Sequence, residues 1–308
     1  MFSNTSIVIF ASMITNIMRR SSKIVFMGLA MLLCSTFGFA QKVNEPNDVP
    51  ADWSKPFQPF RIAGNLYYVG TYDLSCYLIT TPQGHILINT GLANSAKTIK
   101  ANVKTLGFKF SDIKVLLTTQ AHYDHLGAMA EIKKQTGAQF MVDELDAQVA
   151  ADGGQSDYAF GSKGSTFAPI KANRLLHNNE KIALGDMKLV ILHHPGHTKG
   201  SCSYLFNVKD VKHTYRVLIA NLPSIVTEKS FEKILTYPQI AQDYTYTFNA
   251  MEKLKFDIWL SSHASQFHLH KKHKPGDAYD PEKFRDLKSY QTALAELKKE
   301  FNKKIKNK

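Results

Sequence analysis

Cysteine is scarce in this sequence: the 308 residues include only three, Cys34, Cys76 and Cys202. So few thiols exclude a small disulfide-stapled scaffold, and a chain of this length buries enough surface to fold without bridges. Cys76 and Cys202 each lie in an apolar, strand-like run, where a thiol behaves as a small apolar side chain. We therefore expect both to be free, although an oxidising compartment would permit a bridge between them.

Acidic residues are outnumbered, with 26 Asp and Glu against 38 Lys and Arg, which gives a net charge of +12. Such an excess permits binding to nucleic acid or to a membrane surface. The basic residues are not interleaved with stacking aromatic residues, and many lie in the terminal segment 298–308, as is typical of a solvated helix end. We therefore expect no nucleic-acid partner.

Long apolar runs are missing except near the N-terminus, at residues 24–39. Basic residues precede this run, Ala40 ends it, and polar sequence follows, which is the order of a secretory signal peptide. The run is shorter than the about 20 residues that a membrane-spanning helix needs. We therefore predict a signal peptide at residues 1–40 and one domain at residues 41–308.

The predicted signal peptide implies a mature protein in the periplasm, soluble and with no membrane attachment after cleavage. A lipid anchor on Cys34 is the rival interpretation. It is disfavoured because Leu33 stands where such a site normally has a small residue. We also expect a monomer.

The rest of the chain alternates strand-like and helix-like segments, which favours an α/β fold. Period-two and short apolar runs predict strands at residues 66–69, 76–80, 85–88, 113–117, 138–142, 188–192, 202–206, 215–220 and 258–261. Helical spacing of apolar residues predicts helices at residues 95–106, 126–136, 237–254 and 282–304. The Gly- and Ser-rich residues 153–164 are expected to form a loop.

Three good metal ligands fall within four residues, in the run His122-Tyr123-Asp124-His125. The run follows the predicted buried strand 113–117 and precedes a helix start. A loop at a strand end can aim such side chains at one or two adjacent ions, and imidazole and carboxylate are ligands that zinc prefers. The spacing therefore predicts a metal site.

Two further histidines stand at strand ends. His197 follows the turn Pro195-Gly196, which would present its side chain, whereas His193 and His194 are expected either to support the ligands from outside or to be structural. His263 is an isolated histidine after the predicted strand 258–261, and it becomes a candidate as the last ligand of a set that needs one.

Taken in order, His122-x-Asp124-His125, Pro195-Gly196-His197-Thr198 and Ser262-His263-Ala264-Ser265 resemble the metallo-β-lactamase superfamily, and within it the third subclass of class B β-lactamases. Gln120 stands where that family's first motif histidine is expected, so the chain most resembles the variant group that carries glutamine there. The resemblance covers nearly the whole mature chain and implies an αββα sandwich, with two facing sheets and helices outside.

The resemblance also implies two zinc positions. The first position comprises Gln120, His122 and His197, and the second position comprises Asp124, His125 and His263. One or two ions are expected, and the second position should be the tighter because a neutral amide oxygen is a poorer zinc donor than imidazole or carboxylate.

The implied reaction is hydrolysis of the β-lactam amide bond by metal-bound hydroxide, with a bound water, held by Asp124, returning the proton to the leaving nitrogen. The resemblance places Ser224 at the family's carboxylate-contacting serine, and Asn221 is a second candidate. Two residues that would support the metal ligands differ from the family's usual ones. Leu222 stands where many relatives have serine, and Asn89 replaces the superfamily's common aspartate. The preferred class of β-lactam is not predicted.

Other reactions are known on this fold. A glyoxalase-II-like thioester hydrolase or a nuclease usually has an aspartate that bridges the two metals, on the strand after the Gly-His-Thr motif. Here residues 219–224 contain none, which favours the lactamase. A protein that only stores zinc is the weakest alternative, because a store would not need an open coordination position or a ligand as weak as Gln120.

The signal-peptide hypothesis predicts cleavage after Ala40. Intact-mass measurement on the protein from the periplasmic fraction should give a chain that begins at Gln41. Any other N-terminus would refute the cleavage site, and recovery of the protein only with membranes would refute the soluble form.

Overall fold

Two β-sheets form the centre of this protein, whose structure, a computed structural model, describes residues 42–211 and 213–306. The predicted signal peptide at residues 1–40 and Cys34 lie outside the described residues. Within them, one sheet has seven strands in the order β1-β2-β3-β4-β5-β6-β7, and the other has five in the order β12-β11-β10-β9-β8.

The seven-stranded sheet begins as an antiparallel meander over β1–β4 and continues parallel from β4 to β7. Its strands are β1 (Phe60–Ala63), β2 (Leu66–Tyr68), β3 (Tyr77–Thr81), β4 (Gly84–Ile88), β5 (Ile113–Leu117), β6 (Gln139–Asp143) and β7 (Arg174–Leu176). Parallel strands need crossover connections, and helices supply them here.

The five-stranded sheet is antiparallel from β8 to β11 and pairs β11 with β12 in parallel. Its strands are β8 (Lys181–Leu184), β9 (Met187–His193), β10 (Cys202–Lys209), β11 (Thr214–Ala220) and β12 (Ile258–Ser261). The crossover from β11 to β12 contains α6.

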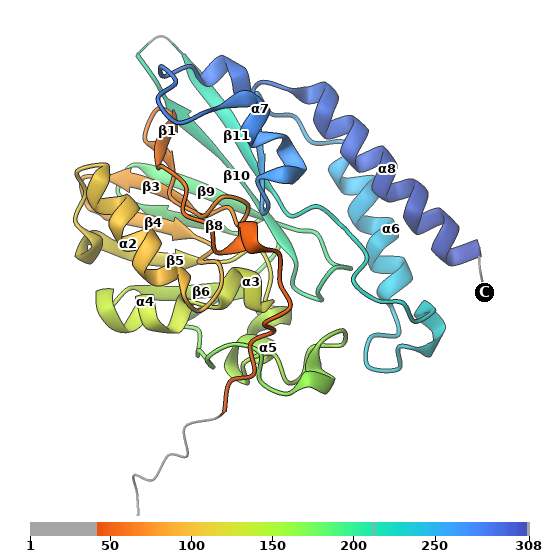
Figure 1. The fold of residues 1–308 in the computed structure, drawn as a ribbon. Coiled ribbons are helices and arrows are strands. Elements are labelled where there is room, and N and C mark those ends of the chain that lie inside the picture. Colours follow the sequence, from red (N-terminus) through yellow and green to blue (C-terminus); the bar gives the residue numbers. More distant parts are fainter. Residues whose placement is uncertain (1–41, 212, 307–308) are drawn as a thin grey trace, which may run out of the picture. The chain divides into compact units, whose positions relative to one another are not determined.

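Helices cover the outer face of each sheet (Figure 1). The α-helices described are α2 (Ser95–Thr105), α3 (Tyr123–Leu126), α4 (Met129–Thr136), α5 (Ala147–Ala151), α6 (Ile240–Met251), α7 (Leu269–Lys272) and α8 (Leu287–Lys306). Short 3₁₀ helices are η1 (Ala51–Trp53), η2 (Phe110–Asp112), η3 (Glu144–Asp146), η4 (Gly161–Lys163), η5 (Phe231–Lys233), η6 (Ser265–Phe267) and η7 (Pro281–Phe284). Helices α2 and α4 lie on the seven-stranded sheet, and α6 and α8 lie on the five-stranded sheet.

Central strands are buried on both faces, which explains their continuous apolar runs. In β3, Ile79 packs in the core shared with the other sheet, whereas Leu78 packs in the cluster under α2 and α4. On the opposite side, Trp259 of β12 packs against Tyr290 of α8, with ring centroids 5.4 Å apart. The layers are therefore helix, sheet, sheet, helix, and the predicted αββα sandwich is confirmed.

Several predicted boundaries were wrong. The helix predicted at residues 126–136 is two helices, α3 and α4, because the backbone leaves helical geometry at Ala128, whose φ is −91° and ψ is 0°. The helix predicted from residue 282 begins at Leu287, since Asp280 and Pro281 start the separate turn η7. Strands β1, β7 and β8 and helices α5 and α7 were not predicted.

Cys76 and Cys202 are both buried free thiols, in agreement with the prediction from the sequence. In the part of the chain that the structure describes, no helix has both the length and the apolar character needed to cross a membrane.

The turn before His197 depends on Gly196, whose φ is +129°. A Cβ there would lie 2.8 Å from Cγ of Tyr244. Gly196→Ala should therefore lower the free energy of unfolding by about 2–4 kcal/mol, the sum of backbone strain and overpacking. Urea denaturation measures this loss.

Gly137→Ala is the matched control, because Gly137 also has positive φ, +69°, but has open space around its Cα. It should lose only the strain, about 1 kcal/mol. Equal losses for the two variants would contradict the packing argument.

Candidate metal centre

The candidate site lies where strand ends from both sheets meet. His122 follows β5 of one sheet, and His197 and His263 follow β9 and β12 of the other. Side chains join the two sheets at this place: Thr119 Oγ1 lies 2.9 Å from Ser262 Oγ. Loops at strand ends leave the regular ladder, so their side chains are free to converge.

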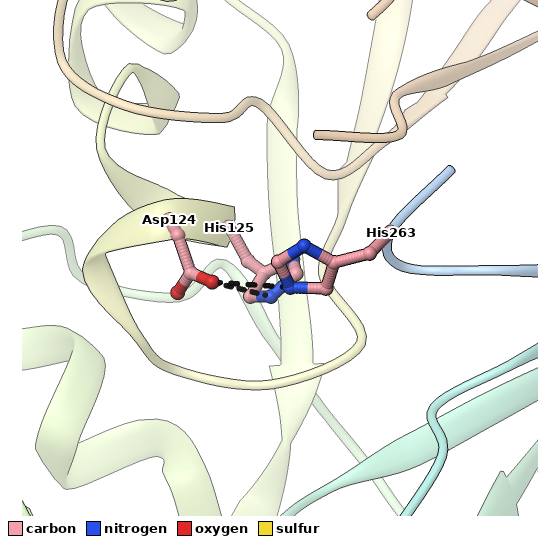
Figure 2. A group of neighbouring side chains, drawn as sticks. All are labelled: Asp124, His125 and His263. Atoms are coloured by element: carbon pink, nitrogen blue, oxygen red, sulfur yellow. Dashed lines mark ion pairs between the residues drawn. The ribbon is translucent and has the colours of Figure 1, made fainter. Parts of the chain in front are cut away.

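Three predicted ligands form one cluster, Asp124, His125 and His263, whose ligand atoms all lie within 4.8 Å of one another. Figure 2 shows the two imidazoles and the carboxylate converging from helix α3 and from the loop after β12. Asp124 Oδ2 lies 3.2 Å from His125 Nε2 and 3.3 Å from His263 Nε2. The structure thus brings the second position together.

Some buried polar atoms at the site have no hydrogen-bond partner, which is what a site for a bound ligand requires. Nδ1 of His125 is buried without a hydrogen-bond partner, and so is Oε1 of Gln120. A buried polar atom without a partner is costly, unless a ligand satisfies it. Lone pairs of imidazole and amide oxygen, next to a carboxylate, are donors that zinc accepts. The residues present therefore fit a bound zinc ion.

Two carboxylates, Asp124 and Asp73, stabilise a positive charge on His263. Burial opposes a charge on His263, but hydrogen bonds to Asp124 and Asp73 raise its pKa to about 9. Burial likewise opposes ionisation of Asp73, whose pKa is nevertheless lowered to about 2 by its hydrogen bonds with His263 and Ser265. To hold zinc, His263 would have to be neutral, because an imidazolium ring has no free lone pair on either nitrogen.

In the first position, the rings of His122 and His197 lie 5.0 Å apart. Burial opposes a charge on His122, but Asp157, 3.4 Å from its Nε2, raises its pKa. Burial and the nearby His122 lower the pKa of His197 to about 3, so His197 is neutral at pH 7. A neutral imidazole is the form that binds a metal.

In each imidazole of the first position, one ring nitrogen has a hydrogen-bond partner in the protein and the other nitrogen is left for a metal. His197 Nδ1 donates to the carbonyl of Ser224 at 2.8 Å, which leaves Nε2. His122 Nε2 faces Asp157, which leaves Nδ1. Gln120 is buried, and its alignment with the two imidazoles stays a prediction.

The two candidate substrate-binding residues lie after β11. Ser224 is partly buried beside His197, and its hydroxyl oxygen lies 3.1 Å from His197 Nδ1. Asn221 is buried, with its Oδ1 accepting from Ser262 Oγ at 3.3 Å and its Nδ2 without a partner. Both residues therefore lie next to metal-ligand loops.

His193 and His194 have hydrogen-bond partners other than the candidate ligands. His193 Nδ1 lies 2.7 Å from Asp143 Oδ2, and His194 Nδ1 lies 2.7 Å from Ser203 Oγ. Neither belongs to the Asp124, His125 and His263 cluster.

Sequence reasoning missed the carboxylates that support the ligands. Asp146 accepts hydrogen bonds from Ala121 N, Thr198 Oγ1 and Gly200 N, and so ties together the loops that carry the first-position residues. Burial raises the pKa of Asp146 to about 6, despite these hydrogen bonds. No local pattern marks such a residue, because its partners are distant in the sequence.

Asn89, which departs from the superfamily pattern, occupies a left-handed conformation with φ +61°. Its Oδ1 accepts from Thr119 N at 2.9 Å, and its Nδ2 donates to Thr119 Oγ1 at 3.1 Å. A neutral amide therefore supports the loop before Gln120. Leu222, the other departure, is buried in the core.

Comparison with known proteins agrees with this geometry. The model of the family "Metallo-beta-lactamase superfamily" matches residues 70–263. The class B3 di-zinc metallo-beta-lactamase LRA-12 from an Alaskan soil metagenome is 65% identical, with a TM-score of 0.84 over 85% of this chain and 100% of that chain. The metallo-beta-lactamase GOB-18 from Elizabethkingia meningoseptica is 55% identical, with a TM-score of 0.87 over 87% of this chain and 100% of that chain.

A shorter match links the chain to another hydrolase. The cytoplasmic hydroxyacylglutathione hydrolase of Arabidopsis thaliana is 35% identical over 99 residues, which are 32% of this chain and 31% of that enzyme. The chain spans less than half the length of the first curated relatives that it matches. The family model and the two lactamase structures cover most of the chain, and on these matches the protein belongs to the metallo-β-lactamase superfamily.

Proposed function

We propose that this protein is a zinc-dependent β-lactamase of class B3, which hydrolyses the amide bond of β-lactam antibiotics. One observation carries the proposal: the Asp124, His125 and His263 cluster lies at the strand ends of a chain that is 65% identical to a class B3 di-zinc metallo-beta-lactamase along that protein's whole length.

The proposed zinc ligands are the two sets defined above. Gln120, His122 and His197 hold the first position, and Asp124, His125 and His263 hold the second. Zinc, when bound, supplies Lewis acidity and a bound water whose pKa is lowered to about 7.

Asp124 is the proposed proton carrier. Its contacts with His125 and His263 hold its pKa well below the ordinary value although burial opposes ionisation, so it is a carboxylate at neutral pH. In hydrolysis the carbonyl carbon gains the water oxygen, the C–N bond breaks, and the nitrogen gains a proton. Asp124 accepts a hydrogen bond from the attacking water and returns its proton to the nitrogen.

Ser224 is the proposed contact for the substrate carboxylate, since it is partly exposed beside His197. A hydroxyl donor suits a carboxylate acceptor. Asn221 is the weaker candidate, because its side chain is buried and only the partnerless Nδ2 is free to donate.

Finer features belong to the same proposal. Gln120 at the first position places the chain in the glutamine-variant group of class B3. Residues 1–40 are proposed as a signal peptide and residues 41–308 as the lactamase domain, acting as a monomer in the periplasm. The order of basic, apolar and small residues before Gln41 supports export.

A thioester hydrolase is the second candidate, supported by the 99-residue match to hydroxyacylglutathione hydrolase. The end of β11 argues against it. Ala220 is followed by Asn221, and no carboxylate there is available to bridge two metals.

The mature chain with zinc should hydrolyse nitrocefin and a carbapenem, followed by absorbance. A chelator should abolish turnover, and added zinc should restore it. Absence of turnover in the zinc-replete protein would overturn the lactamase, and hydrolysis of a glutathione thioester by the same sample would promote the alternative.

Two histidine variants control this assay. His263→Ala should lower kcat/KM by more than about 100-fold, beyond the loss typical of an outer partner of a ligand. His177→Ala should be neutral, because His177 is exposed and its ring pairs with Glu144, which is not among the candidate ligands.

Zinc titration into chelated protein should show the second position filling first, with hydrolysis present at one equivalent, because a carboxylate offsets the ion's charge there. Gln120→His should raise the affinity of the first position at least about tenfold, equivalent to about 1.4 kcal/mol, with only a modest change in rate. Activity that stays near zero until the second equivalent binds would contradict a catalytic single-zinc form.

A further inference from the structure

Three imidazole–carboxylate pairs in this chain share one arrangement of atoms. In each, the aspartate Oδ1 accepts a backbone N–H and its Oδ2 faces a ring nitrogen. The pairs are Asp157 with His122, Asp73 with His263, and Asp143 with His193. Two of the three histidines are proposed zinc ligands, one in each position, and the third is not.

Asp157 is buried and reaches the first position from the loop at residues 153–164. Its Oδ1 accepts from Ala159 N at 2.9 Å and from Phe160 N at 2.7 Å, which fixes the carboxylate on its own loop. Its Oδ2 lies 3.4 Å from His122 Nε2. Among the described residues, Asp157 is not part of a three-residue cluster that could hold a metal. Its contact is with Nε2 of His122, the ring nitrogen that we call the outer one because Nδ1 is left for the metal.

The same loop contacts the other histidine of the first position. The hydroxyl of Tyr158 donates to the carbonyl of His197 at 3.1 Å, and the ring of Phe160 lies edge-on to His122 with centroids 4.8 Å apart. The loop therefore contacts both histidines of the first position, His122 at its ring and His197 at its backbone carbonyl.

Asp73 serves the second position from a different part of the fold, the connection between β2 and β3. Its Oδ2 lies 3.1 Å from His263 Nδ1, and its Oδ1 accepts from Ser265 N at 2.8 Å. Its backbone carbonyl also accepts from Ala264 N at 2.7 Å. Three hydrogen bonds therefore fix the loop that carries His263.

We infer that Asp157 and Asp73 are positioning residues dedicated to different zinc positions, Asp157 directing Nδ1 of His122 to the first and Asp73 directing Nε2 of His263 to the second. An acceptor at the outer nitrogen keeps the proton there, so the inner lone pair is free for the metal, and it raises the basicity of the ring. This inference rests on the proposed zinc ligands and assigns each position its own support.

Asp157→Asn and Asp73→Asn test it. Each variant keeps Oδ1 for the backbone N–H groups and replaces Oδ2 by an NH₂ donor, which cannot accept the ring proton. Asp143→Asn is the matched control, because Asp143 has the same bonds to Leu145 N and His193.

The measurement is zinc titration of the chelated mature chain against a chromophoric chelator, with no β-lactam present. Asp157→Asn should weaken the first position by about 10–100-fold and leave the second within about threefold. Asp73→Asn should do the reverse, and Asp143→Asn should shift neither step. Long-range ¹H–¹⁵N spectra should show a changed tautomer at His122 alone in the first variant and at His263 alone in the second.

Equal weakening of both steps by either variant, or no shift in the step assigned to it, overturns the inference. Melting temperatures verify folding, and if an Asn variant does not fold, Asp157→Ser and Asp73→Ser keep a local acceptor for the loop N–H groups without reaching the histidine. Selective shifts in a protein that hydrolyses no β-lactam would support this inference while refuting the proposed function.

Discussion

The structure depends on one electrostatic constraint. Imidazoles and carboxylates that are buried at the seam, the edge where the strand ends of the two sheets meet, must pair with one another. A buried carboxylate without a partner costs several kcal/mol. Here Asp124 lies between His125 and His263, Asp157 faces His122, and every carboxylate named at the seam has a partner. The carboxylates at the seam are therefore paired without a metal. Among the described residues there, only a few nitrogen and oxygen atoms stay without a partner.

Hydrogen bonds across the seam make the site a property of how the two sheets pack. Tyr204 of β10 donates to the carbonyl of Thr118 at 2.7 Å, and Cys202 N donates to the carbonyl of Thr119 at 2.9 Å. The loop that carries Gln120 and His122 is thus fixed by the opposite sheet. Each proposed ligand set takes residues from both sheets, since His197 and His263 follow strands of the five-stranded sheet and their partners follow β5. A shift of one sheet over the other would therefore pull each set apart, so the core between the sheets also preserves the geometry of the site.

The sequence predicted the parts of the site that are local. His122, Asp124 and His125 are adjacent in the chain and follow a buried strand, and strand ends are where polar clusters in α/β folds converge. Asp73 and Asp157 were not predicted, because only tertiary folding brings each beside its histidine. The sandwich itself came from the resemblance to a family, since alternating strands and helices do not specify which strands share a sheet. Short edge strands such as β7 and β8 have too few residues for a periodic pattern.

The contact between Asp73 and His263 joins residues 190 positions apart, and Thr119 meets Ser262 across 143 positions. Contacts of such sequence separation form late, because the long loop must close before they contribute energy. Asp124 and His125 are neighbours even in an unfolded chain, whereas His263 comes beside them only when β12 takes its place in the sheet. The three-residue cluster is therefore complete only in the folded chain, and a metal ion held by all three residues would stabilise the folded state over the unfolded one.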